Sequence, residues 1–305
     1  MILCCGEALI DMIPDENGAF TPHAGGAVFN TAIGLGRQGI DVGLMSGVSN
    51  DMFGQKLVGE LDESSVKTDF LVRSDHPTTL AFVHLVNGKA SYAFYDENTA
   101  GRMVQPNDLP RQLPKDNKAL FFGGISLAVD PCADTYLEML LRNANDRLIM
   151  VDPNIRANFI ADEVQYRARL GKILQHTDIL KVSDEDLDWI NPSNTGMETK
   201  VAQIIEQGPK LILVTLGADG VMAFTRNGLV SKAVSPSVQV MDTVGAGDAF
   251  NAGVLTYLAR DDALSKVAVV NITDQALQPV LQFATVFASD TVTKQGSNPA
   301  WNFRV

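Results

Sequence analysis

The chain has 305 residues, of which 46% are hydrophobic and 20% charged. A chain of this length and apolar content can bury a sizeable core, which excludes an intrinsically disordered protein. Its 24 Lys and Arg residues against 36 Asp and Glu residues give a net charge of −12. That balance argues against binding to nucleic acid or to anionic lipid surfaces, because both need a basic face.

Cysteine and histidine usage predicts neither a disulfide framework nor a zinc site. Cys4 and Cys5 are adjacent, Cys132 is distant, and the four histidines are scattered, so the spacings of metal ligands are missing. Residues 1–10 form a short apolar run with acidic interruptions and predict a buried strand, not a signal peptide. Apolar stretches long enough to span a bilayer are absent from the sequence. We therefore expect a cytoplasmic protein, and the pattern assigns the three cysteines no role.

Apolar runs and helical patterns alternate along most of the chain. This order predicts an α/β fold in which helices flank a mainly parallel sheet. We expect strands at residues 1–9, 120–123, 148–152, 179–182 and 211–216. We expect helices at residues 27–38, 134–143, 163–175 and 201–207.

Residues 79–95 break this alternation, because two β-prone arms flank the dipeptide Asn87-Gly88. That dipeptide favours a two-residue type I′ hairpin turn, in which both residues need positive φ. A second turn is expected at residues 15–18. We therefore predict one domain spanning residues 1–305, with insertions at about 12–23 and 76–100 that form a small β lid. An ordinary surface hairpin is the alternative.

The most informative segment is DTVGAGDAFNAG at residues 242–253, which follows a β-like run at 237–240. An apolar helical pattern begins inside the segment, so Gly245 and Gly247 lie where a loop opens into a helix. Glycine lets the backbone turn sharply there, and the first helical turn offers unpaired N–H groups and partial positive charge. The segment thus predicts a binding site for an anion.

Asp248 permits two interpretations from chemistry alone. It is either a first-turn acid stabilised by the helix dipole or a general base that accepts a proton from an attacking hydroxyl. In both cases we expect the dipole to keep this carboxylate ionised. A P-loop is excluded by the missing GxxxxGK[ST] pattern, and the third small residue of a dinucleotide fingerprint is missing too.

Two segments resemble the signatures of the ribokinase (PfkB) family of sugar kinases. DTVGAGDAF at residues 242–250 resembles the C-terminal signature, and AGGAVFNTAIGLGRQG at residues 24–39 resembles the N-terminal one. The resemblance implies an α/β core with a β lid and transfer of a phosphoryl group from ATP to a sugar hydroxyl. It implies that Asp248 is the catalytic base and that Gly245, Ala246 and Gly247 form the anion hole. The implied sugar contacts are Asp11, Gly25, Gly26 and Asn30.

The same resemblance implies a nucleotide site. Its expected residues are Ser183, Thr215, Gly217, Gly220 and Thr285. KVSDED at residues 181–186 falls where the family has an NxxE motif, so Asp186 is expected to hold Mg²⁺ through water, with Glu185 as the competing candidate. A solvated helix start is the structural alternative for this acidic cluster. A monovalent cation such as K⁺ beside the signature loop is a further family-level expectation.

DPNIR at residues 152–156 resembles the fructokinase and 2-keto-3-deoxygluconate kinase branch. Arg156 is expected to contact the substrate, whereas Arg102 is interpreted as an exposed charge of the flap. D-fructose, converted to fructose 6-phosphate, is the expected reaction, with 2-keto-3-deoxygluconate as the alternative substrate. A sugar- and nucleotide-binding protein without turnover, and a hydride-transferring enzyme, are alternatives of other classes. The expected partners are the sugar and ATP, and the oligomeric state is left open, a homodimer included.

Overall fold

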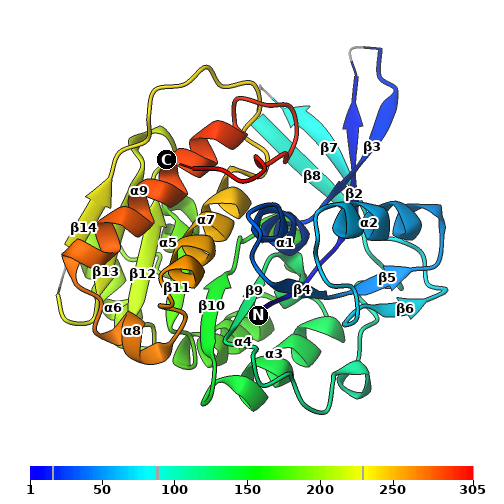
Figure 1. The fold of residues 1–305 in the computed structure, drawn as a ribbon. Coiled ribbons are helices and arrows are strands. Elements are labelled where there is room, and N and C mark those ends of the chain that lie inside the picture. The colour runs from blue at the N-terminus through cyan, green and yellow to red at the C-terminus, as the bar shows by residue number, and fades with distance from the viewer. Residues whose placement is uncertain (16, 87–88, 229, 305) are drawn as a thin grey trace.

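The computed structural model describes residues 1–15, 17–86, 89–228 and 230–304. Its main feature is an eight-stranded sheet in which the first six strands are parallel and the last two antiparallel (Figure 1). The strand order is β4 (Val42–Met45), β1 (Ile2–Cys5), β9 (Ala119–Gly123), β10 (Leu148–Asp152), β11 (Ile179–Ser183), β12 (Leu211–Thr215), β13 (Val221–Thr225) and β14 (Val230–Ala233). The predicted fold class is confirmed.

Helices cover both faces of this sheet. One face packs against α1 (Ala27–Arg37), α2 (Met52–Glu63), α7 (Ala246–Arg260), α8 (Lys266–Val270) and α9 (Asp274–Thr291). The other packs against α3 (Cys132–Asn143), α4 (Glu163–Gln175), α5 (Asp184–Ile190) and α6 (Met197–Ile205). Side chains alternate across a strand, so Cys4 is buried in the first core and Cys5 in the second. Among the described helices, none is long and apolar enough to cross a membrane.

Four further strands form a smaller sheet beside the main one (Figure 1). Its order is β3 (Phe20–Gly25), β2 (Leu9–Pro14), β7 (Leu80–Val86) and β8 (Lys89–Tyr95). The turn expected at residues 15–18 includes residue 16, which lies outside the described residues; on either side of it, Asp15 Oδ1 accepts hydrogen bonds from the amides of Asn17 and Ala19. The predicted Asn87-Gly88 turn lies outside the described residues. A separate pair joins β5 (Gly47–Ser49) to β6 (Val72–Ser74).

One predicted strand has wrong bounds, and one β-like run forms no strand. Residues 1–9 do not form one strand, because β1 ends at Cys5 and Leu9 already begins β2 of the smaller sheet. The chain changes sheets at Gly6, where a Cβ atom would lie 2.5 Å from Val28 Cγ2. Residues 237–240 form no strand either: Val238 and Val240 are exposed, and strand pairing is absent from this described segment. Alternating apolar residues therefore do not make a strand where a neighbouring strand is missing.

The order of the parallel strands reverses at β1, because the strands that follow it in the chain lie on both of its sides. From β1, which lies next to the edge of the sheet, the chain continues to the edge strand β4 on one side, and later to β9 on the other. In open α/β sheets, ligands bind beyond the carboxyl ends of the strands at such a switch point. The loops after β1, β9 and β10 meet there, and the smaller sheet stands over the same edge (Figure 1).

Candidate functional site

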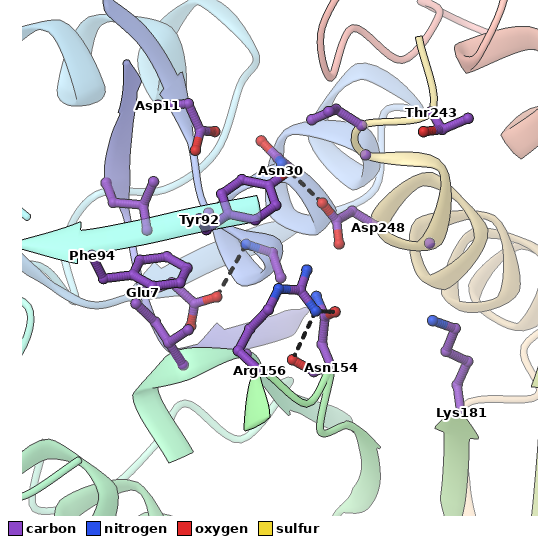
Figure 2. Close-up of a pocket in the computed structure, with 18 residues that line it drawn as sticks. Glu7, Asp11, Asn30, Tyr92, Phe94, Asn154, Arg156, Lys181, Thr243 and Asp248 are labelled. Carbon is purple, nitrogen blue, oxygen red and sulfur yellow. Dashed lines mark hydrogen bonds between the residues drawn. The ribbon is translucent and has the colours of Figure 1, made fainter. Parts of the chain in front are cut away.

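A cavity of about 220 Å³ lies at this edge, between the smaller sheet and the first turn of α7 (Figure 2). It is smaller than the roughly 300–1,000 Å³ typical of pockets for drug-sized ligands, and half of its lining residues have polar side chains, which suits a small polar ligand. The predicted site residues that line it are Asp11, Gly26, Asn30, Arg156, Gly245, Gly247 and Asp248. The residues that sequence analysis did not select are Glu7, Leu9, Ala27, Tyr92, Phe94, Gly124, Ile125, Asn154, Lys181, Thr243 and Val244.

The two signature segments meet in this cavity. Asn30 Nδ2 donates a hydrogen bond of 2.9 Å to Asp248 Oδ2, although the two residues are 218 positions apart. Thr31 Oγ1 donates to the backbone oxygen of Asp248 at 3.3 Å. Helices α1 and α7 are thus joined at their N-terminal ends, and the candidate base is held by the candidate sugar-binding helix.

Asp248 is 7% exposed, and burial raises the pKa of its carboxyl group to about 7. The hydrogen bond from Asn30 and the charge of Lys181 lower this pKa, whereas the charges of Asp152 and Glu7 raise it. The helix dipole was expected to keep this acid ionised, but burial raises its pKa, because loss of solvent disfavours the charged form. A carboxylate with a pKa near neutrality is well matched to general-base catalysis.

The loop before α7 forms a concave set of amides. Gly245 has a φ of 78°, and a Cβ atom there would lie 2.2 Å from Ser297 Oγ, so the position favours glycine. The amide of Ala246 makes a hydrogen bond of 3.3 Å to the Thr243 carbonyl oxygen. The amides of Gly247 and Asp248 have no acceptor within the described residues. These two N–H groups, at the positive end of a 15-residue helix, suit a phosphoryl group.

Asp11 occupies the opposite side of the cavity, on β2 (Figure 2). Burial raises the pKa of its carboxyl group to about 7, while Arg156 lowers that pKa and Glu7 raises it. A Cβ atom on Gly25 would lie 2.0 Å from Asp11 Oδ2, so glycine at this position makes room for the carboxylate. Gly26, with a φ of 109°, precedes the first residue of α1.

Arg156 enters the cavity from the loop after β10. Its guanidinium carbon lies 5.7 Å from the centre of the Tyr92 ring, and Nη1 donates to Asn154 Oδ1 at 2.6 Å. The side chain predicted to contact the substrate therefore lines the cavity. Arg102 has a different position: it forms an ion pair with Asp96 at 3.4 Å and donates to the Asp130 carbonyl oxygen. It is partly buried, not an exposed charge of the flap as expected.

The candidate nucleotide residues are less well gathered. Thr215, at the end of β12, donates to the Val182 carbonyl oxygen at 3.3 Å, and Gly217 and Gly220 shape the following turn with φ values of 56° and 95°. These positions share the carboxyl edge of the sheet with the anion-binding loop. Thr285 is 3% exposed within α9, so its side chain is turned into the protein and is not offered to solvent.

The acidic cluster after β11 forms the cap of α5. Ser183 Oγ accepts from the Asp186 amide at 3.0 Å, and Asp186 Oδ2 accepts from the Ser183 amide at 3.1 Å. Asp186 Oδ1 accepts from the Ile155 amide at 3.0 Å, so both of its oxygens are engaged, whereas Glu185 is exposed. The described residues contain no group of three or more potential metal-binding side chains. The donor set fits Mg²⁺ that is held mainly by phosphate and water.

Two buried charged residues of the site were missed. Glu7 follows β1, and its carboxylate accepts from the amides of Ala27 and Ser126. Gly124 leaves room for it, since a Cβ atom there would collide with the Glu7 carboxylate. Lys181 lies in the buried strand β11 and donates to Asp152 Oδ2 at 2.9 Å. A charge within an otherwise apolar strand was the signal that could have identified Lys181.

Comparison with known proteins agrees with this geometry. Residues 1–303 match the protein family described as "pfkB family carbohydrate kinase". The chain is 46% identical over 282 residues to a fructokinase of Rhizobium leguminosarum bv. trifolii, covering 91% of this chain and 86% of the relative. The crystal structure of a fructokinase from Xylella fastidiosa with bound ATP superposes with a TM-score of 0.89 at 32% identity, over 97% of this chain and 93% of that chain. A sugar kinase of Pyrococcus horikoshii in complex with ATP matches with a TM-score of 0.84 at 28% identity, over 99% and 96% of the two chains. The chain belongs to the pfkB family of carbohydrate kinases.

Proposed function

We propose that this protein is a fructokinase, which transfers the γ-phosphoryl group of ATP to the primary hydroxyl of D-fructose and forms fructose 6-phosphate. One observation carries the proposal: the buried carboxylate of Asp248 lies beside the free amides of Gly247 and Asp248, and both face the cavity that contains Asp11 and Arg156. Similarity to fructokinases over most of the chain supports the choice of substrate.

The reaction uses these groups in fixed positions. Asp248 accepts the proton of the sugar hydroxyl as its oxygen bonds to the γ-phosphorus, and the bond from that phosphorus to the β–γ bridging oxygen breaks to release ADP. The free amides of the α7 N-terminus stabilise negative charge on the transferring group. Asp11 and Asn30 hold sugar hydroxyls, since a carboxylate accepts hydrogen bonds and an amide both donates and accepts them.

Mg²⁺, when bound together with ATP, would neutralise charge on the phosphates. The residues that would complete its shell through water are Glu185 and Asp186, and Glu185 is the freer of the two because the Asp186 oxygens already accept backbone hydrogen bonds. Roles for Ser183, Thr215, Gly217, Gly220 and Thr285 in nucleotide binding stay predictions, with Thr285 the least accessible. A monovalent cation beside the signature loop also stays a prediction.

Charge in the cavity favours a neutral sugar over a keto acid. Glu7, Asp11 and Asp248 face Arg156 and Lys181, and Lys181 is already paired with Asp152. A substrate carboxylate would therefore meet three acidic groups, Arg156, and a lysine whose charge is already balanced by Asp152. Arg156 is the single group of this set that would favour 2-keto-3-deoxygluconate, through a paired hydrogen bond to its carboxylate.

We further propose that the chain forms a single domain and that the smaller sheet acts as a lid. Tyr92 and Phe94 of β8 line the cavity, so movement of this sheet would open or close it. Closure over the sugar would exclude water from the phosphoryl group.

The deciding experiment measures ADP release with Mg-ATP across a panel of sugars. We expect turnover with fructose, and little with ribose or with 2-keto-3-deoxygluconate. Turnover with 2-keto-3-deoxygluconate alone would identify that keto acid, and not fructose, as the substrate. Absence of ADP release with every sugar, from protein that binds ATP, would contradict the kinase proposal and favour a binding protein without turnover.

A further inference from the structure

A buried polar cluster lies beside the cavity, and its residues have no role in the proposed reaction as described above. Asp152 is the last residue of β10, and its side chain is 2% exposed. Asp152 Oδ2 accepts from Lys181 Nζ at 2.9 Å and from Asn251 Nδ2 at 2.7 Å, while Oδ1 accepts from the Asn154 amide at 3.1 Å. The carboxylate thus connects β10, β11 and α7 through hydrogen bonds.

Lys181 is the charged member of this cluster that lines the cavity. Its side chain is 6% exposed, and Figure 2 shows it extending from β11 towards α7. A Cβ atom built on Gly247 would lie 3.1 Å from Lys181 Nζ. The lysine ammonium therefore lies close to the backbone of Gly247, one of the two residues with free amides.

The cost of burying these charges argues for a role beyond stability. Burying an ion pair costs hydration free energy, which the attraction between the two charges often fails to offset. Such a pair is therefore weak evidence of a stabilising function. Three acidic groups face Lys181 from different elements: Asp152 on β10, Asp186 on α5 and Asp248 on α7. Their charges, with the hydrogen bond from Asp152, raise the pKa of Lys181 despite its burial, and the amine stays protonated at neutral pH.

We propose that Lys181 is a catalytic residue that contacts the γ-phosphoryl group during transfer, and that Asp152 and Asn251 are positioning residues that aim it. The inference rests on the proposed kinase function. Positive charge fixed in a site that excludes water stabilises the charge that develops on the transferring group. Because Asn251 is in the same helix as Asp248, the cluster also fixes the base relative to the lysine.

The test compares Lys181→Met with Lys200→Met. Lys200 is also largely buried and bonded to an aspartate, Asp188, at 2.7 Å, but it belongs to α6, away from the cavity. We expect Lys181→Met to lower kcat by about 10²–10³-fold, the usual effect of removing one group that stabilises transition-state charge, with little change in KM for fructose. The Lys200 variant keeps the wild-type kcat.

Two further measurements separate a catalytic role from a structural one. Calorimetry should show that Lys181→Met weakens binding of AMP-PNP, a non-hydrolysable ATP analogue, at least tenfold more than binding of ADP, which has no γ-phosphoryl group. Lys181→Met should also move the acidic limb of the kcat–pH profile to higher pH. The groups that face Asp248 are Asn30, Asp152, Lys181 and Glu7. Removal of the lysine charge leaves the pKa of the Asp248 carboxyl group higher, because a nearby positive charge favours its ionised form.

The double variant Lys181→Met/Asp152→Asn guards against misfolding, because Lys181→Met alone leaves a buried carboxylate without its partner. It removes both charges, and we expect the same loss of kcat from a folded protein. Wild-type turnover in this variant, with a wild-type ratio of AMP-PNP to ADP affinity, would overturn the inference and leave the pair as a link between β10 and β11. If the wild-type protein itself shows no turnover, that result would contradict the kinase proposal instead. The comparison of AMP-PNP and ADP binding would still test the role of Lys181.

Discussion

Single residues of the site are kept in electrostatic states that would be unfavourable on the surface. Burial raises the pKa of both Asp11 and Asp248 to about 7, although the usual value for aspartate is close to 3.8. The glycines beside these residues, Gly25 and Gly247, lack the Cβ atom that would displace a charged neighbour. The site therefore places acidic groups where solvent cannot stabilise their charge, which is the usual origin of a reactive carboxylate.

The raised pKa of Asp248 predicts opposite effects on activity and stability. We expect Asp248→Asn to lower kcat by about 10²–10⁴-fold, the usual contribution of a general base, with ATP affinity nearly unchanged. The folded-state pKa of about 7 exceeds the unfolded value of 3.8, so ionisation disfavours the folded wild type as pH rises towards 7. The advantage of the variant in free energy of unfolding should grow by about 1–3 kcal/mol between pH 5 and pH 8.

Urea denaturation at the two pH values measures this advantage, with Asp219→Asn as the control because Asp219 is exposed in the turn after β12. A pH-independent difference for Asp248→Asn would mean that this carboxyl group has a near-normal pKa in the folded protein. Wild-type turnover in the variant would exclude Asp248 as the base.

At the scale of the element, glycines divide into those that packing requires and those that merely weaken a helix. Helix α2 contains one of each kind. A Cβ atom on Gly54 would lie 1.9 Å from the Ser49 carbonyl oxygen, whereas nothing lies within 4 Å of a Cβ atom on Gly59. The two positions differ in surroundings but share one helix, so they form a matched pair.

This pair predicts a change of sign along α2. Gly59→Ala should raise the free energy of unfolding by about 0.5–1 kcal/mol, because alanine restricts the unfolded chain and favours the helix. Gly54→Ala should destabilise the protein, since the backbone of β5 must move to admit the methyl group. Thermal denaturation of the two variants gives the comparison, and destabilisation by both would show that α2 is more tightly packed than its open position at Gly59 indicates.

Sequence analysis succeeded at this scale wherever a pattern was local. The helix at 163–175 and the strand at 148–152 were predicted with the bounds that the structure gives. It failed where the outcome depended on distant neighbours: residues 237–240 alternate as a strand does, yet have no strand to pair with. The pKa of Asp248 was misjudged for the same reason, since its burial comes from segments far away in the chain.

At the scale of the whole molecule, the two sheets enclose the cavity from opposite sides. The main sheet supplies the edge at which its parallel strands end, and β2 and β8 supply Asp11, Tyr92 and Phe94. The net charge of −12 opposes a free nucleotide anion, but it is a property of the surface, whereas α7 presents free amides locally. An acidic protein can therefore bind ATP, particularly as its magnesium complex.

The lid proposal predicts a change in protection when sugar binds. Fructose should slow hydrogen exchange of the described amides in β2 and β8, because a closed sheet opens less often. The matched comparison is β13 at the far side of the main sheet, where exchange should not change. Equal exchange in β2 and β8 with and without saturating fructose would show that the smaller sheet does not respond to the ligand.

The neighbouring thiols of Cys4 and Cys5 give the molecule an internal reporter. They lie on opposite faces of the one strand β1, in two separate cores, and like Cys132 they are buried. Burial raises the pKa of all three thiols, so the folded protein should resist alkylation. A reagent that reacts with Cys4 and Cys5 at one shared rate would reveal that both helical layers come apart in a single event, and staggered rates would reveal two.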